Sequence, residues 1–251
     1  MTLLVADGLA KAFGGNQVVG DVSFGIGAGE IVALIGPNGA GKSTCFNILS
    51  GQVRPDRGRV VFAGTDITAL SPSRRWRLGI GRGFQVAATF GSLTVRDNVR
   101  VALLSRDRLV WRFLRRASAL LSDEADARLA EVGILPLASQ PASTLAYGDL
   151  KRLELALALS NTPRLLLMDE PTAGMTPPDR RSTMALLRHL AQAHGSAVLL
   201  TDHDMDVVFQ IADRVLVLDK GRLIADGVPT EVRSDPQVRA AYLGNDDQHP
   251  V

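Results

Sequence analysis

The first thirty residues alternate apolar and polar positions around glycine-rich turns. Apolar residues occur at 3–5, at 18–19, and at 22 and 24. A Gly-Gly-Asn turn at residues 14–16 separates the first group from the others. A period of two that is interrupted by glycine and asparagine is typical of half-buried strands joined by tight turns. We therefore expect short antiparallel strands at the start of the chain.

From residue 31 the pattern changes to short, continuous apolar runs. Such runs occupy residues 31–35, 165–168 and 197–200. Four or five apolar residues in a row are typical of parallel strands that are covered on both faces. These three segments are the expected centre of a buried parallel sheet.

Helical patterns occupy much of the remaining chain. We expect helices at residues 42–49, ending at Gly51, and at residues 178–193. Residues 72–160 carry helical periodicity and few β-branched residues, which predicts a helical insertion. Within it, the arginine-rich residues 106–116 predict an amphipathic helix with a solvated basic face. Helices that alternate with buried strands predict an α/β fold.

Further strands are expected outside the buried runs. Residues 60–62 precede Gly64, and residues 214–218 and 222–225 surround an Asp-Lys-Gly turn that predicts a hairpin. Two short helices are expected after this hairpin, followed by a frayed tail at residues 245–251.

The composition excludes several classes of protein. Of 251 residues, 46% are hydrophobic and 22% are charged, which is too apolar for a disordered chain. The 28 Lys and Arg against 26 Asp and Glu give a formal net charge of +2 and no argument for a nucleic-acid partner.

The sequence has neither an apolar run of about 20 residues nor a basic start before an apolar core, so we expect no membrane span and no signal peptide. The single cysteine, Cys45, excludes an internal disulfide and is expected to serve packing. We expect the chain itself to be soluble and cytosolic.

The strongest candidate for chemistry follows the first buried run. Nine residues fit the G-x-x-x-x-G-K-[ST] pattern of a P-loop: Gly36, Pro37, Asn38, Gly39, Ala40, Gly41, Lys42, Ser43 and Thr44. Glycines let the backbone turn with its N–H groups aimed inward, and the helix that follows adds its positive N-terminal end. Such a loop binds a chain of phosphates. Lys42 is expected to reach the β- and γ-phosphates, and the Ser43 hydroxyl is expected to bind Mg²⁺.

A second candidate is the acidic pair that ends the run at residues 165–168. In a P-loop enzyme, the first acid, Asp169, serves the Mg²⁺ shell, and the adjacent Glu170 orients and deprotonates the attacking water. An acidic pair after a strand is, taken alone, commonly a solvated strand end. Its combination with the P-loop favours the catalytic interpretation.

Three weaker features gain meaning from their order. The sequence Leu-Ala-Tyr-Gly-Asp at residues 145–149 opens a helical run shortly before the acidic strand. Gln85 lies at the entry to the helical insertion, and His203 follows the run at residues 197–200. Taken alone, a histidine or a glutamine more often has a structural or solvated role, so the order and spacing of these features carry the argument.

Together these motifs resemble those of the ATP-binding subunit of an ABC transporter, over residues 3–244. The resemblance implies the following roles: Walker A at residues 36–44, the Q-loop glutamine at Gln85, the signature motif at residues 145–149, Walker B Asp169 with catalytic Glu170, the H-loop histidine at His203 and the adenine-stacking A-loop aromatic at Phe13. It also implies a P-loop NTPase (RecA-like) core with an N-terminal antiparallel β subdomain and an inserted helical subdomain. Residues 1–251 then form one ABC ATPase domain, with 1–71 and 161–251 as the core and β subdomain and 72–160 as the helical subdomain.

The resemblance further implies how such a chain works. Two ATPase subunits, identical or different, pair head to tail, so that ATP lies between the P-loop of one and the signature residues of the other, here Ala146, Tyr147, Gly148 and Asp149. Glu170 is the expected general base, His203 bonds the γ-phosphate, and Gln85 senses Mg²⁺, which Ser43 and Asp169 also bind. The implied partners are two membrane permease subunits and, indirectly, a solute-binding protein, which would hold the chain peripherally at the cytoplasmic face of the inner membrane.

Finer features resemble the branched-chain amino-acid (Liv-type) importer subfamily. They are the variant signature, the Ala-Gly-Met-Thr run at residues 173–176, the stretch at residues 81–85 and the Ala-Tyr-Leu-Gly run at residues 241–244. The implied function is ATP hydrolysis that powers import of branched-chain amino acids or related small polar solutes. The alternatives are a urea or amide importer, a lipopolysaccharide exporter, or a soluble ABC ATPase of DNA repair or translation.

The chain also departs from the common family pattern. Ala146 replaces a serine, Asp149 replaces a glutamine, and Thr176 replaces the D-loop aspartate. These changes put in question how strongly this signature supports hydrolysis in the partner's P-loop, and they leave the P-loop half unaffected.

Overall fold

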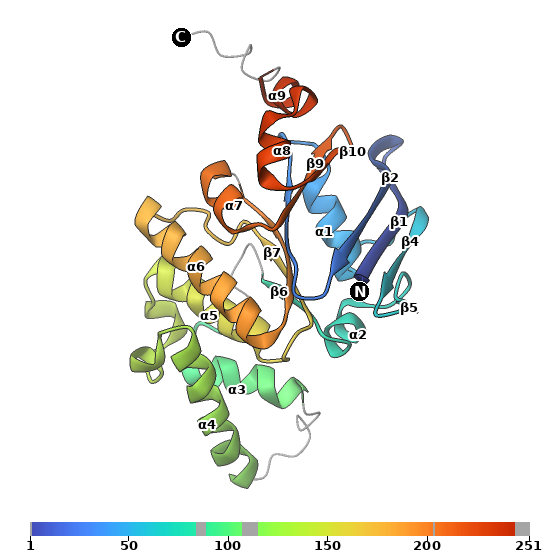
Figure 1. The fold of residues 1–251 in the computed structure, drawn as a ribbon. Coiled ribbons are helices and arrows are strands. Elements are labelled where there is room, and N and C mark those ends of the chain that lie inside the picture. Colours follow the sequence, from blue (N-terminus) through green and yellow to red (C-terminus); the bar gives the residue numbers. More distant parts are fainter. Residues whose placement is uncertain (1, 84–88, 107–114, 203, 244–251) are drawn as a thin grey trace.

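The computed structural model describes residues 2–83, 89–106, 115–202 and 204–243 (Figure 1). Its strands form two sheets. The smaller sheet has the order β2-β1-β4-β5, and all of its pairs are antiparallel. Its members are β1 (Thr2–Phe13), β2 (Asn16–Gly27), β4 (Arg57–Phe62) and β5 (Thr65–Asp66).

The expected antiparallel start of the chain is confirmed, but its strands are long rather than short. β1 and β2 have twelve residues each and pair along their whole length with several register shifts. Gly8 and Asp21 adopt positive φ values of 60° and 66° close to one of these shifts. Bulges of this kind interrupt the alternation of side chains, and one long strand therefore looks like several short ones in the sequence.

The larger sheet lies at the centre of the molecule, in the order β10-β9-β3-β8-β7-β6. Its members are β3 (Ile31–Ile35), β6 (Ile80–Gly83), β7 (Leu165–Asp169), β8 (Ala197–Thr201), β9 (Arg214–Asp219) and β10 (Arg222–Gly227). β10 is antiparallel to β9, and the other pairs are parallel. Every residue of β3, β7 and β8 is buried, which confirms the interpretation of the three apolar runs.

β6 lies within the segment that was expected to be helical, and that expectation is wrong for these four residues. β6 pairs with β7 at the edge of the larger sheet. A Cβ atom on Gly81 would lie 3.0 Å from the Ala158 carbonyl oxygen, and one on Gly83 would lie 2.9 Å from Met168 Sδ. Close packing therefore favours glycine at two of the four positions, and glycine removes the β-branched signal that identifies a strand.

The helices cover both faces of the larger sheet. They are α1 (Lys42–Ser50), α2 (Pro72–Arg77), α3 (Val95–Arg106), α4 (Arg115–Glu131), α5 (Tyr147–Leu159), α6 (Pro177–His194), α7 (Met205–Ile211), α8 (Pro229–Ser234) and α9 (Pro236–Leu243), with 3₁₀ turns at Leu135–Leu137 and Ala142–Thr144. α1 ends at Gly51, whose φ is 81°, as expected. The predicted helix at 178–193 is confirmed as α6, and the predicted hairpin as β9 and β10.

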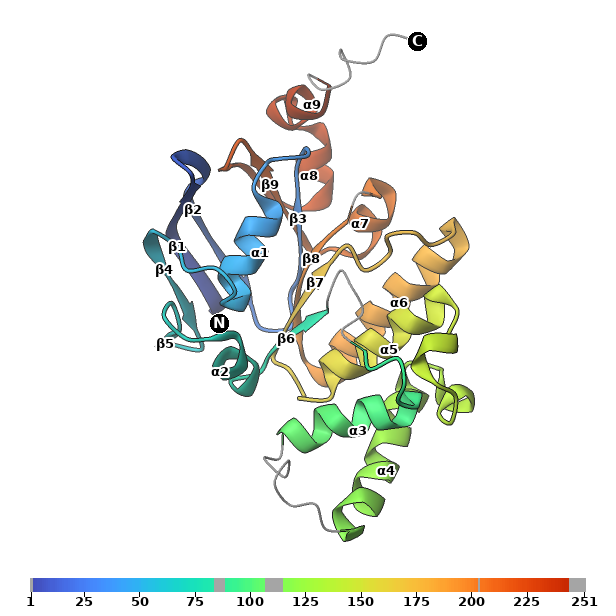
Figure 2. The ribbon, with the colours of Figure 1, turned by 180° about the vertical axis from the view of Figure 1, so that it is seen from behind.

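Alternate side chains of the larger sheet enter two separate cores. Ile31, Ala33 and Ile35 of β3 pack with residues of α5 and α6, whereas Val32 and Leu34 pack with α1 and the smaller sheet. Figures 1 and 2 show α1 between the two sheets and α5 and α6 on the opposite face. β3 is thus fixed from both sides, and the loop that leaves its end starts from a rigid base.

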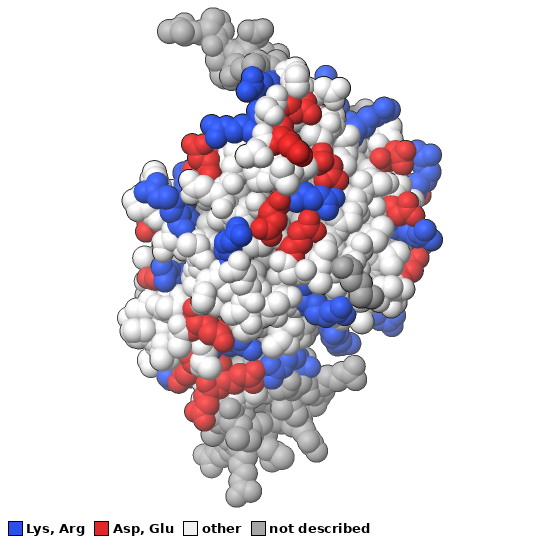
Figure 3. All heavy atoms as spheres, in the orientation of Figure 1, with Lys and Arg blue, Asp and Glu red and all other residues white. Residues whose placement is uncertain are grey.

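α3 and α4 lie apart from the smaller sheet, at the far end of the molecule (Figure 1). α5 packs against both of them and against β6, so it joins this helical part to the larger sheet. The division at residues 71/72 and 160/161 stays a prediction. None of the described helices is long and apolar enough to cross a membrane. Acidic and basic side chains are interspersed on the face shown in Figure 3, in keeping with the near-balanced charge.

Candidate functional site

The loop from Gly36 to Gly41 joins β3 to α1 and has the backbone of a phosphate-binding loop. Gly36 and Gly41 adopt φ values of 150° and 103°. A Cβ atom on Gly36 would lie 2.1 Å from the Leu218 carbonyl oxygen, and one on Gly41 would lie 2.7 Å from the Val18 carbonyl oxygen. Both positions therefore require glycine for conformation and for space.

The Lys42 side chain folds back onto this loop and bonds its backbone. Its Nζ donates to the carbonyl oxygens of Gly36 at 2.7 Å and of Pro37 at 2.9 Å. Burial lowers the pKa of Lys42, and the charges of Glu170 and Asp169 act in the opposite direction. The ammonium group is thus held at the loop, and it lies near enough to the two acids predicted from the sequence to be influenced by their charges.

The start of α1 supplies further donors. The Cys45 N–H donates to the Gly41 carbonyl oxygen at 3.0 Å, which is the first bond of the helix. The N–H groups of Lys42, Ser43 and Thr44 precede that bond, and such groups at a helix N-terminus are free to bind an anion. The predicted loop residues thus form one stretch of backbone from the end of β3 to the first turn of α1, with N–H donors at its helical end.

The two acids lie where β7 ends, and Thr201 at the end of β8 holds both. Asp169 is buried, and its Oδ1 accepts a hydrogen bond from Thr201 Oγ1 at 2.7 Å. Glu170 has a φ of 51°, and its N–H donates to the Thr201 carbonyl oxygen at 3.1 Å. A left-handed backbone at a residue other than glycine costs energy and is typical of functional sites.

The donor set fits Mg²⁺. Asp169 supplies a carboxylate oxygen, and Ser43 at the start of α1 supplies an exposed hydroxyl. Mg²⁺ is usually bound by one or two such protein oxygens together with substrate phosphates and water. A cage of protein ligands is not required, and the described residues contain no cluster of three or more His, Cys, Asp or Glu that could form one.

The signature residues form the exposed start of α5. Ala146 is the N-cap residue and has no side-chain bond to the helix, and the first helical bond runs from the Leu150 N–H to the Ala146 carbonyl oxygen at 2.9 Å. The N–H groups of Tyr147, Gly148 and Asp149 precede this bond. A Cβ atom on Gly148 would meet nothing within 4 Å, so this helix start is open to a ligand or a partner.

Phe13 ends β1 with 48% of its surface exposed. Lys11 Nζ lies 5.4 Å from the centre of the Phe13 ring and also pairs with Asp56 at 2.7 Å. An exposed ring with one supported face can stack on a flat ligand. Phe13 therefore does not belong to the core, which is the alternative to the A-loop interpretation.

Two predicted site residues, Gln85 and His203, lie outside the described residues, as do most of the arginine-rich segment 106–116 and the tail at 245–251. Cys45 is fully buried, and burial raises the pKa of its thiol to about 12. This fits the expected packing role.

The structure adds residues that the sequence analysis missed at this site. Besides Thr201, Tyr242 on α9 lies near the backbone of Gly36, and burial raises the pKa of Tyr242 to about 12. The Gly221 N–H also donates to the Ala40 carbonyl oxygen at 3.0 Å. The C-terminal part of the chain thus packs against the P-loop. The Ala-Tyr-Leu-Gly run was the only sequence signal for this contact.

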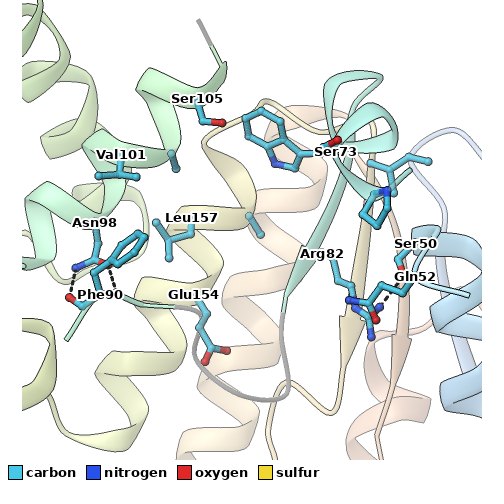
Figure 4. Close-up of a pocket in the computed structure, with 15 residues that line it drawn as sticks. Ser50, Gln52, Ser73, Arg82, Phe90, Asn98, Val101, Ser105, Glu154 and Leu157 are labelled. Carbon is cyan, nitrogen blue, oxygen red and sulfur yellow. Dashed lines mark hydrogen bonds between the residues drawn. The ribbon is translucent and has the colours of Figure 1, made fainter. Parts of the chain in front are cut away.

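A pocket of about 360 Å³ lies beside the site, between α2, β6, α3 and α5 (Figure 4). Its walls are largely apolar, with Trp76, Phe90 and Leu157 among them. Two charged groups, Arg82 and Glu154, enter from opposite sides (Figure 4). Arg82 Nε and Glu154 Oε1 are buried and have no hydrogen-bond partner among the described residues. Burial raises the pKa of Glu154, against the effect of its bond from Lys151.

Comparison with known proteins places these features in one family. The profile of the ABC transporter family matches residues 19–173, and that of the branched-chain amino acid ATP-binding cassette transporter matches residues 222–248. The chain is 39% identical to the high-affinity branched-chain amino acid transport ATP-binding protein LivG of Salmonella typhimurium, over 96% of this chain and 98% of LivG. It is 37% identical to BraF of Pseudomonas aeruginosa, which has the same description, with the same coverage.

Solved structures agree. A nucleotide-free ATP-binding cassette from an ABC transporter superposes with a TM-score of 0.87 at 29% identity, over 96% of this chain and 99% of the other. The ADP conformation of an ATP-binding cassette of an ABC transporter superposes with a TM-score of 0.86 at 30% identity, over 97% of this chain and 99% of the other. The P-loop, the acidic strand end and the exposed signature helix thus belong to a P-loop ATPase, and the chain is a member of the ABC transporter family, as one of its ATP-binding cassettes.

Proposed function

We propose that this chain hydrolyses ATP to power an importer of branched-chain amino acids or related small polar solutes. The observation that carries the proposal is a P-loop whose Lys42 is held on the loop carbonyl oxygens, together with a buried acid at the end of β7 whose charge acts on Lys42. The names of LivG and BraF support the cargo. The match at residues 222–248 supports the same subfamily.

The P-loop half binds the nucleotide. Backbone N–H groups of the loop and of the start of α1 surround the phosphates, and Lys42 turns from the loop carbonyl oxygens to the β- and γ-phosphates. Phe13 stacks on the adenine ring. Ser43 and Asp169, together with Gln85, would hold Mg²⁺, which would supply positive charge against the charge that develops on the phosphates. In the structure, Lys42 contacts two backbone carbonyl oxygens, and phosphate oxygens of bound ATP would take their place.

Glu170 takes the proton from the attacking water. Its backbone is fixed to Thr201, so its carboxylate is carried on a rigid strand end rather than on a free loop. His203 follows β8 in the chain and is assigned to the γ-phosphate, where it keeps Glu170 and the water aligned. A rigid base near the reacting water needs little reorganisation during the reaction.

A second ATPase subunit completes the site. The open N-terminus of α5, with residues 146–149, offers its N–H groups and positive end to the γ-phosphate bound by the partner subunit's P-loop. Ala146 provides no hydroxyl for this contact, and Asp149 adds negative charge in the first turn. The signature therefore acts chiefly through its backbone.

The pocket beside β6 is the proposed docking place for a helix of a permease subunit. It is apolar, and it holds one donor and one acceptor that lack partners among the described residues. Docking of two permeases would keep the chain at the cytoplasmic face of the membrane, and a solute-binding protein would act on the permeases from the other side.

Reconstitution tests the function directly. The chain, co-purified with its permeases and inserted in proteoliposomes with the binding protein, is expected to accumulate radiolabelled leucine only with ATP and Mg²⁺. Uptake of urea or an amide instead of leucine would support the assignment as a transport ATPase and contradict the assignment of branched-chain amino acids as its cargo. ATP hydrolysis that no permease or solute stimulates would indicate a soluble, non-transport ATPase.

A further inference from the structure

Arg82 on β6 contacts parts of the molecule that have separate roles. Its Nη1 donates to Ser50 Oγ at 2.6 Å, and its Nη2 donates to Asn47 Oδ1 at 3.0 Å. Both acceptors belong to α1, the helix that follows the P-loop. Nη2 also lies 3.9 Å from Asp169 Oδ2. The same guanidinium lines the pocket (Figure 4).

Asp169 is approached from both of its neighbouring strands. β7 lies between β6 and β8 in the sheet. Thr201 at the end of β8 bonds Oδ1, and Arg82 on β6 approaches Oδ2. Only 4% of the Asp169 side chain is exposed, so these protein contacts, rather than water, determine where its carboxylate points.

The guanidinium can transmit a contact because it is planar and rigid. Its five N–H groups keep a fixed relation to one another, so a bond made at one nitrogen constrains the direction of the others. Nε is buried and has no partner among the described residues. An acceptor that enters the pocket and bonds Nε would therefore reorient both Nη groups relative to α1 and Asp169.

We propose that Arg82 is a positioning residue that links occupancy of the pocket to the orientation of Asp169 and α1. The proposal rests on the proposed function, in which a permease segment fills the pocket. The occupant presents a hydrogen-bond acceptor to Nε, as a backbone carbonyl or a carboxylate does. Arg82 itself contacts neither ATP nor the reacting atoms. Residues that orient a metal ligand in this way typically change metal affinity about 10- to 100-fold when they are replaced.

The test uses Arg82→Met, which keeps an unbranched stem and removes every donor, and Arg82→Lys, which keeps the charge without the planar fork. Arg77→Met is the matched control, because Arg77 is an exposed arginine at the end of α2. Equilibrium binding of a fluorescent ATP analogue is measured at increasing Mg²⁺ concentration. Each variant is compared as the isolated chain and as the chain assembled with both permeases.

For the isolated chain, we expect Arg82→Met to raise the half-saturating Mg²⁺ concentration about tenfold, Arg82→Lys to raise it less, and Arg77→Met to leave it unchanged. Assembly with the permeases is expected to shift the Mg²⁺ requirement of the wild type and of Arg77→Met, but not that of Arg82→Met. Analogue binding without Mg²⁺ should differ less among the four proteins than binding with Mg²⁺, since the Asp169 carboxylate contributes only when the metal is bound.

Two results would overturn the inference: an Arg82→Met chain with the Mg²⁺ dependence of the wild type, or an assembly-dependent shift that persists without Arg82. If Arg82→Met does not fold, Arg82→Lys and Asn47→Ala answer the same question, since each removes part of the contact between Arg82 and α1. Failure of the wild type to bind the analogue at all would contradict the proposed function instead, so the two failures are distinguishable.

Discussion

Thr201→Val removes one hydroxyl at the point where both acids of the site are held. In the wild type, Thr201 Oγ1 donates to Asp169 Oδ1 at 2.7 Å and accepts from the Glu170 N–H at 3.1 Å. Thr201 is 1% exposed, so water does not replace the missing donor. Valine has nearly the same shape, and the substitution therefore leaves the packing intact.

The expected magnitude follows from the charge of the acceptor. A hydrogen bond to a charged group contributes about 1.5–3 kcal/mol to stability. The Glu170 N–H retains its bond to the Thr201 carbonyl oxygen, so the loss falls on Asp169 alone. Thr201→Val should lower the free energy of unfolding by about 1.5–3 kcal/mol and should also slow ATP hydrolysis, because the Asp169 carboxylate is no longer oriented.

Urea unfolding, followed by circular dichroism with an unchanged m value, measures the loss of stability. Thr201→Ser is the control, because it keeps the hydroxyl and removes one buried methyl group, which costs about 1 kcal/mol. Hydrolysis by Thr201→Ser should stay near the wild-type rate. If Thr201→Val has wild-type stability and wild-type hydrolysis, the hydroxyl does not hold Asp169 and the reasoning is refuted.

Three other variants test separate parts of the site. Phe13→Ala should weaken ATP binding, while the wild type binds ATP and GTP similarly. Nucleotide titration checks both statements, and unchanged affinity would remove Phe13 from the site. Tyr242→Phe removes the phenol oxygen that lies near the Gly36 backbone, and should weaken nucleotide binding severalfold with little effect on folding. Equal affinities of wild type and Tyr242→Phe would show that α9 does not support the P-loop. Ala146→Ser with Asp149→Gln should raise ATP turnover of the assembled transporter or tighten its ATP-bound dimer. Turnover that is equal or lower, with unchanged dimer affinity, would show that the variant signature already matches its partner site.

Much of the fold could be predicted because its signals are local. The buried runs that became β3, β7 and β8 contain only apolar residues before the acid or threonine that ends β7 and β8. β6 could not be predicted, since its identity as a strand comes from pairing with β7, and its glycines serve close packing against α5 and Met168. Tertiary contact overrides local propensity at such an edge strand.

The site shows the same division. The P-loop and the acids at the end of β7 follow from short motifs with a physical mechanism. Thr201, Arg82 and Tyr242 could not be assigned, because each acts through a contact with a residue far away in the chain. A threonine, an arginine or a tyrosine has no meaning of its own in the sequence until the fold shows which group it faces.

The most direct test of the account is the ATP-dependent pairing of two cassettes in the Glu170→Gln protein. Glutamine has nearly the same shape as glutamate but cannot accept the water's proton, so ATP should bind and remain intact. In ATP and Mg²⁺, light scattering after size exclusion should show the 26.8 kDa chain paired with a second copy or with a second ATPase subunit. Lys42→Ala, added to the same protein, should abolish the pairing. A chain that binds ATP yet stays monomeric, alone and with a second ATPase subunit, would contradict the head-to-tail nucleotide sandwich.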